Sequence, residues 1–171
     1  MKILAYLFLF VSISLFAQGK ETISWDDATL NNKLTLTVSK RNFDKIYKKA
    51  DSIVTPKYAD ICGTDADSNF QYVYYKGAQF EMDNGILNFR ELKLDKKTGM
   101  FFTYKGTRYD YNTKLDDFKK LFPNAGASVN DSDDKVYKII KLDPAEAGDD
   151  SEWIFYFKNG ALAIIECKFS C

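Results

Sequence analysis

Phe80-Glu81-Met82-Asp83-Asn84-Gly85-Ile86-Leu87 is the stretch that decides the predicted fold. Its Asn84-Gly85 pair suits a tight two-residue hairpin turn, because both turn positions need positive φ. Pairing across that turn sorts the flanking side chains by face: Phe80, Met82, Leu87 and Phe89 lie on one side, and Gln79, Glu81, Asn88 and Arg90 on the other. The stretch therefore predicts an antiparallel hairpin with one core face and one wet face.

The same pattern returns 75 residues later as Phe155-Tyr156-Phe157-Lys158-Asn159-Gly160-Ala161-Leu162. The same ungapped shift also places Asn42–Tyr47 on Asp117–Phe122. Two separate segments that obey one offset predict an internal duplication. The alternative is a chance match between helix and hairpin patterns.

Each repeat unit is predicted to be a helix followed by antiparallel strands. Ser39 caps the first expected helix, over 40–49, which carries an apolar stripe of Phe43, Ile46 and Tyr47. Thr113 with Asp116 resembles a capping box for the second helix, which Pro123 ends. The expected strands cover 70–75, 79–83, 86–94, 100–109, 135–142, 153–158 and 161–169.

These elements predict an α+β fold. Two helix-plus-antiparallel-hairpin repeats, at about 34–109 and 110–171, would form a curved antiparallel sheet with the helices packed on one face. The second hairpin has an unusually apolar reverse face of Ile154, Tyr156, Ala163 and Ile165. Either the two halves pack against each other there, or this surface receives a partner.

Strand tyrosines are the first candidates for partner contact, because tyrosine offers a large contact area with a polar tip. Core packing in an aromatic-rich sheet is the alternative. Tyr74 and Tyr75 point to opposite faces, so both cannot enter one core. The predicted partner-binding residues are Tyr74, Tyr75, Glu81, Arg90, Tyr104 and Tyr156.

Residues 1–17 have the form of an export signal. Lys2 precedes an apolar run, and Leu15-Phe16-Ala17 provides a peptidase site. The run is shorter than the roughly 20 residues of a spanning helix. We expect cleavage after Ala17, a periplasmic or secreted location, and a single mature domain over 18–171 without membrane insertion.

In an oxidising compartment, the three cysteines of the chain can form a disulfide bond. Cys167 and Cys171 lie four apart on one predicted strand and cannot bridge without bending it. We therefore expect a disulfide between Cys62 and Cys171, with Cys167 as a small buried group. A bridge from Cys62 to Cys167, or three free thiols, are the alternatives.

Composition argues against several functions. Lys and Arg together equal Asp and Glu at 24 each, which gives no overall field to attract nucleic acid or an anionic membrane. The chain has no histidine, the commonest general base and metal ligand, so we expect neither an enzyme nor a cofactor or metal. Asp65–Asn69 spaces oxygens like half a calcium loop, but Phe70 and Lys76 stand where that loop needs Gly and Glu.

The stretch Leu34–Val54 leads through Val38-Ser39 and Phe43–Tyr47 to Lys49-Ala50-Asp51-Ser52-Ile53. It resembles the opening helix unit of the small outer-membrane assembly lipoprotein family and the tandem-repeat β-lactamase inhibitory protein fold. This resemblance implies a non-catalytic protein that binds other proteins through its sheet face. It transfers no individual functional residue.

The predicted function is that of an exported, non-catalytic protein that binds another protein in the envelope or outside the cell. An inhibitor or immunity-type role against a secreted effector or hydrolase is the specific form of this prediction. The alternatives are an envelope structural or assembly factor and a periplasmic protein that binds a small ligand.

Overall fold

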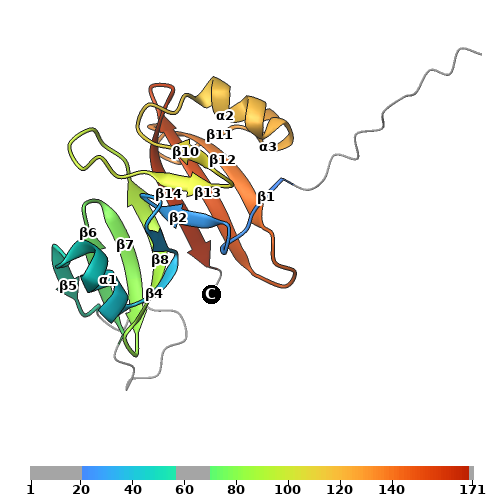
Figure 1. Ribbon diagram of the computed structural model, residues 1–171. Helices are drawn as coiled ribbons and strands as arrows, with labels where there is room; N and C mark the ends of the chain where they lie inside the picture. Colours follow the sequence, from blue (N-terminus) through green and yellow to red (C-terminus); the bar gives the residue numbers. More distant parts are fainter. Residues whose placement is uncertain (1–20, 57–69, 170–171) are drawn as a thin grey trace, which may run out of the picture.

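The computed structural model describes residues 21–56 and 70–169 of the chain, and these residues form a mostly β structure of two sheets (Figure 1). The larger sheet has ten strands and the smaller has four. The predicted α+β repeat fold is therefore wrong. The four-stranded sheet, rather than helices alone, covers the large sheet, and it joins residues 28–30, which precede the predicted repeats, to segments inside the first one.

The ten-stranded sheet follows the order β1-β12-β13-β14-β8-β7-β6-β5, with β11 paired to β12 and β4 paired to β8. Its pairings are antiparallel except at β1, which runs parallel to β12, so the sheet is mixed. The bounds of its strands are β1 Thr22–Ile23, β4 Thr37–Ser39, β5 Ser52–Val54, β6 Gln71–Tyr75, β7 Ala78–Asp83, β8 Ile86–Lys93, β11 Asn130–Asp131, β12 Lys138–Pro144, β13 Ser151–Lys158 and β14 Ala161–Phe169.

Both predicted Asn-Gly hairpins are confirmed. Asp83 pairs with Ile86 and Lys158 with Ala161, and the four turn residues all have positive φ. The predicted core face of the first hairpin is also confirmed, because Phe80, Met82, Leu87 and Phe89 are all buried.

The four-stranded sheet has the order β10-β9-β2-β3, with bounds β10 Thr107–Tyr109, β9 Phe102–Tyr104, β2 Ala28–Leu30 and β3 Leu34–Thr35. The segment predicted as one strand over 100–109 folds back on itself at Lys105-Gly106, where both residues have positive φ. Phe102 points inward from β9 and contacts Phe89 and Trp153 of the large sheet. This sheet thus closes the core over β8 and β13.

Three short helices complete the covered side: α1 (Lys40–Tyr47), α2 (Leu115–Leu121) and α3 (Pro123–Ala127). Ser39 caps α1 as predicted, since its hydroxyl accepts a hydrogen bond from the Asn42 N–H. Thr113 does not cap α2. Its hydroxyl accepts from the Asp110 N–H instead, and Lys114 occupies the cap position without a side-chain bond.

Each of the two longer helices contributes one fully buried phenylalanine. Phe43 of α1 packs edge-on against Phe80, and Phe118 of α2 packs on Phe155 and Phe157. The two hairpins therefore each receive a helix. The other residues of the predicted stripes are more exposed: Ile46 is 39% exposed and Leu121 is 52% exposed.

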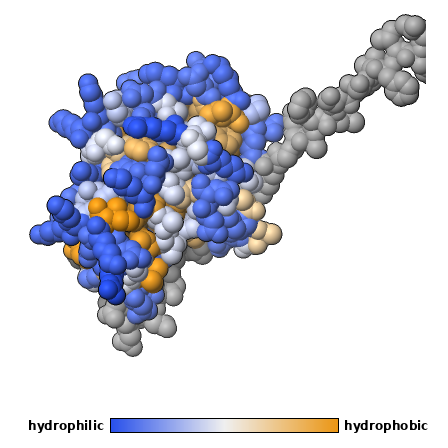
Figure 2. Space-filling view, viewed as in Figure 1, coloured by the Kyte–Doolittle hydropathy of each residue, from blue (hydrophilic) through white to orange (hydrophobic). Residues whose placement is uncertain are grey.

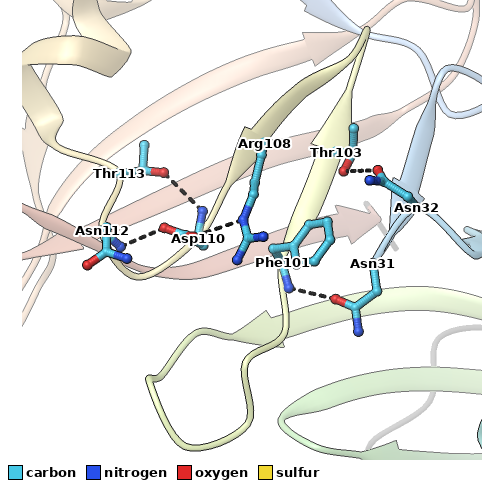
Figure 3. A network of polar contacts seen from close by, with 8 residues as sticks. All are labelled: Asn31, Asn32, Phe101, Thr103, Arg108, Asp110, Asn112 and Thr113. Carbon is cyan, nitrogen blue, oxygen red and sulfur yellow. Dashed lines mark hydrogen bonds and ion pairs between the residues drawn. The ribbon is translucent and has the colours of Figure 1, made fainter.

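A polar network on the outward side of the small sheet ties its turns together (Figure 3). The Asn31 side-chain oxygen Oδ1 accepts from the Phe101 N–H at 2.9 Å, and the Thr103 hydroxyl donates to Asn32 Oδ1 at 2.7 Å. The Arg108 guanidinium lies over the Phe101 ring and pairs with Asp110 at 2.9 Å. Since these groups satisfy one another, we treat the network as a brace of the small sheet.

Candidate partner-binding face

The ten-stranded sheet has one covered face and one open face. Helices α1 and α2 and the four-stranded sheet all contact the covered face, which is the side seen in Figure 1. Within residues 21–56 and 70–169, no helix or strand packs over the other side. We call that side the open face, and its central side chains are Tyr72, Tyr74, Glu81, Arg90, Ile154, Tyr156, Ile164 and Glu166.

A row of aromatic rings follows β6 along the open face. Phe70, Tyr72 and Tyr74 alternate with the buried Val73 and Tyr75, as strand geometry requires. The ring of Tyr72 contacts those of Phe70 and Tyr74, with centroids 5.4 and 6.5 Å apart. The row presents half-buried aromatic surface near the β5 edge of the sheet.

Arg90 occupies a β-bulge. Gln79 pairs with Glu91 while Phe80 pairs with Phe89, so Arg90 is the extra residue of β8. Its Nη2 atom forms an ion pair with Glu81, and its guanidinium lies over the ring of Phe169 on β14. The Nε and Nη1 atoms are buried and have no hydrogen-bond partner. Arg90 therefore connects β7 with β14 across β8.

A tyrosine and two carboxylates form the middle of the open face. The Tyr156 hydroxyl donates to Glu166 Oε2 at 2.5 Å, and Glu166 lies directly opposite Glu91 in the β14–β8 pairing. Burial, followed by the Glu166 carboxylate, raises the pKa of Tyr156 well above its usual value. Tyr156 thus stays a hydroxyl donor at physiological pH.

A second β-bulge, in β14, changes which side chains of the other hairpin share a face. The predicted apolar face of Ile154, Tyr156, Ala163 and Ile165 is therefore wrong at Ile165. Tyr156 pairs with Ile164 and Phe157 with Leu162, which leaves Ala163 as the extra residue of β14. Beyond the bulge the faces exchange, so Ile165 is fully buried in the core and Ile164 lies on the open face. Ile154 also lies on the open face and is only 5% exposed, because neighbouring side chains surround it.

Four of the six predicted partner-binding residues lie on this face: Tyr74, Glu81, Arg90 and Tyr156. The other two are in the core. Tyr75 is 9% exposed and stacks on Tyr47, and Tyr104 is 5% exposed with its hydroxyl donating to the Thr22 carbonyl. Tyr75 and Tyr104 therefore contribute to packing rather than to the accessible surface.

The six predicted partner-binding residues do not include Tyr72, Ile164 or Glu166. The alternation of Phe70, Tyr72 and Tyr74 is a usable signal for Tyr72, because three aromatic residues at a spacing of two predict one strand face. Ile164 and Glu166 had no such signal. Their face depends on the bulge at Ala163, which a strict alternation cannot reveal.

The cysteine prediction is tested at one position only. Cys167 is a free thiol, 1% exposed, and burial raises its pKa to about 12. Cys62, Cys171 and the possible calcium loop at Asp65–Asn69 lie outside the described residues. The Cys62–Cys171 disulfide stays a prediction.

Residues 21–56 and 70–169 provide neither a metal-binding cluster nor a membrane-spanning helix. These residues contain no group of three or more Cys, Asp or Glu side chains placed to bind a metal ion. The same part of the chain has no helix with the length and apolar character needed to cross a bilayer.

No protein-family model, curated protein or solved structure matches this chain. The resemblance to the outer-membrane assembly lipoproteins and the β-lactamase inhibitory proteins stays a prediction.

Proposed function

We propose that the chain is an exported, non-catalytic protein that binds another protein through the open face of its ten-stranded sheet. The observation that carries this proposal is the asymmetry of the sheet. One face is fully packed by helices and a second sheet, while the other offers half-buried aromatic, arginine and isoleucine side chains without a described covering element.

The residue types of the open face support a protein partner. Tyrosine and arginine are the side chains most often found as binding hot spots, and a central apolar residue surrounded by polar ones is typical of an interface core. Ile164 forms such a centre, with Tyr156 and Glu166 beside it. An inhibitor or immunity-type role is the form of this function that we propose, because it requires binding and no chemistry.

Affinity capture with the tagged mature chain tests this proposal. Wild-type protein should recover one specific partner from envelope or culture extracts. Tyr74→Arg places a bulky charge in the aromatic row and should lower recovery by at least about tenfold, as loss of a hot spot does. Thr29→Arg is the matched control, because Thr29 is half-buried on the outward side of the small sheet.

Equal recovery by the Tyr74→Arg and wild-type proteins would contradict the use of the open face. Failure of the wild-type protein to capture any partner would contradict protein binding as the function. Circular dichroism of both variants checks that each is folded.

A further inference from the structure

The α1–β5 end of the molecule carries a concentrated positive charge that the neutral composition conceals. Residues 40–54 contain five basic side chains and two acidic side chains, Asp44 and Asp51. Asp44 is already paired with Lys40 at 2.6 Å. Arg41, Lys45, Lys48 and Lys49 are exposed, and none of them makes an ion pair with any described residue.

These four charges lie close enough to repel one another. Arg41 and Lys45 are four apart in α1, a spacing at which like charges destabilise a helix. The helix dipole favours the lysines near its C-terminus but offers nothing to Arg41 in the first turn. Elsewhere, Lys93, Lys120, Lys138 and Lys141 each pair with a nearby carboxylate.

Exposed aliphatic side chains lie among these charges. Ile46 of α1 is 39% exposed, and Ile53 and Val54 of the edge strand β5 are 44% and 47% exposed. Ile53 also lines a shallow hollow between α1 and β5, together with Lys48 and Lys49. At the α1 end in Figure 2, hydrophilic side chains lie directly beside hydrophobic patches.

We propose that this α1–β5 corner, defined by Arg41, Lys45, Ile46, Lys48, Lys49, Ile53 and Val54, binds peripherally to an anionic phospholipid surface. Basic side chains around protruding aliphatic ones are the combination by which peripheral proteins hold to such membranes. The local charge overrides the expectation from net composition, because only charges within about a Debye length of the surface, roughly 10 Å, act on it.

A lipid surface fits the corner better than a rigid acidic protein does. The apolar tips belong to a helix and to a sheet edge, and three separate aliphatic tips can each enter a deformable headgroup layer. The corner adjoins the open face, because Val54 pairs with Tyr72 and lies on the same side of the sheet. Membrane binding at β5 leaves the middle of the open face, at Tyr156 and Glu166, three or more strands away from the lipid.

Vesicle co-sedimentation of the mature chain tests the proposal. The protein should sediment with vesicles that contain phosphatidylglycerol and remain in solution with pure phosphatidylcholine. Raising salt from about 0.05 M to about 0.3 M should release it, because screening weakens surface attraction.

Variants locate the binding surface. Lys48→Glu with Lys49→Glu should weaken partitioning at least about tenfold, since each basic residue near an anionic surface contributes about fivefold. Lys96→Glu with Lys97→Glu makes the same change in net charge at an exposed turn on β8–β9 and should have little effect. Ile53→Thr should weaken binding, while Val136→Thr, at a site of similar exposure, should not.

Absence of wild-type binding to the anionic vesicles would overturn the proposal, as would equal losses in the two lysine variants. Binding to polyglutamate without binding to vesicles would indicate an acidic protein as the occupant and would also overturn it. Partner capture through Tyr74 is measured without lipid, so either proposal can fail while the other holds.

Discussion

The guanidinium carbon of Arg90 lies 3.6 Å from the ring centroid of Phe169, and the Nη2 atom of the same group pairs with Glu81. One side chain thus connects the three strands β7, β8 and β14. The pairing of β14 with β8 extends only from Ile164 to Glu166. Arg90 therefore provides a contact between these strands beyond the end of their hydrogen-bonded ladder.

Arg90→Lys should lower the free energy of unfolding by about 1–2 kcal/mol, because lysine keeps the charge but loses the planar stacking and the forked donors. Urea denaturation measures this loss. Arg108→Lys is the matched control: its guanidinium also lies over a ring, that of Phe101, but its side chain is 55% exposed. Arg108→Lys should lower the free energy of unfolding by less than about 0.5 kcal/mol. Equal losses in the two variants would contradict a special role for Arg90.

Tyr47→Phe should not destabilise the protein at neutral pH. The Tyr47 hydroxyl is buried without a hydrogen bond of good geometry, and the nearby Asn31 side chain acts on it only weakly, slightly lowering its pKa against the larger effect of burial. Removing an unsatisfied buried group is neutral or stabilising, in contrast to removing a satisfied one. A loss above about 1 kcal/mol at pH 7 would show that the hydroxyl is bonded after all.

The same substitution should change the stability at alkaline pH. Burial, followed by the charge of nearby Tyr75, raises the pKa of Tyr47 from 10.0 to about 12. The folded state therefore holds this proton more tightly than the unfolded state, so stability is constant below pH 10 and falls as pH rises towards 12. Tyr47→Phe should make that fall shallower. An unchanged slope would contradict the prediction.

Gly77→Ala should be far more harmful than Gly106→Ala. Both glycines follow a lysine in a hairpin turn and have positive φ, of 88° and 77°. A Cβ on Gly77 would lie 2.6 Å from the Lys93 carbonyl oxygen, whereas a Cβ on Gly106 would meet open space. We expect Gly106→Ala to lower the free energy of unfolding by about 1 kcal/mol, and Gly77→Ala to lower it by at least about 2 kcal/mol more than that. Thermal melts of both variants check this, and similar values would show that β8 moves away freely.

The number of cysteines that alkylation labels should rise in defined steps as the protein is denatured and then reduced. The native, unreduced protein should take up no iodoacetamide, because Cys167 is buried with its pKa raised to about 12 and the predicted Cys62–Cys171 bridge would occupy the other two cysteines. Denaturation without reduction should expose one thiol, and reduction should expose all three. Mass spectrometry gives the count. Three labels without reduction would disprove the Cys62–Cys171 bridge.

Strong local signals predicted the long hairpins correctly. The Asn84-Gly85 and Asn159-Gly160 turns dictate their own conformation, and the alternation of Phe80, Met82, Leu87 and Phe89 dictates which face is buried. Ser39 likewise marks the start of α1, because its cap interaction lies within four residues. Where the determining contact is local, the sequence is sufficient.

The small sheet escaped prediction because its strands are only two or three residues long. No periodicity can be recognised over such a length, and β2 pairs with β9 from a segment about 70 residues away. The turn at Lys105-Gly106 was present in the sequence, but the aromatic residues around it favoured one continuous strand. The fold class was wrong for this reason.

The open face was predicted in part. Tyr74, Glu81 and Tyr156 follow from simple alternation, whereas Ile164 and Ile165 exchange faces at the Ala163 bulge. The sequence around Tyr104 does not predict its burial, because that burial depends on packing between the two sheets. The basic corner at α1 was hidden for another reason: a net charge summed over the chain says nothing of where each sign is placed.

The opposite sign is gathered at the end of β12 and in the β12–β13 connection, where Asp143, Glu146, Asp149 and Asp150 lie toward the other edge of the sheet from α1 (Figure 1). A chain with 24 acidic and 24 basic side chains thus carries clusters of opposite sign near opposite edges of its large sheet. At neutral pH it should adsorb to cation and anion exchangers alike, through different ends. In dilute salt, neighbouring molecules should orient head to tail, a tendency that an isoelectric point alone would never suggest.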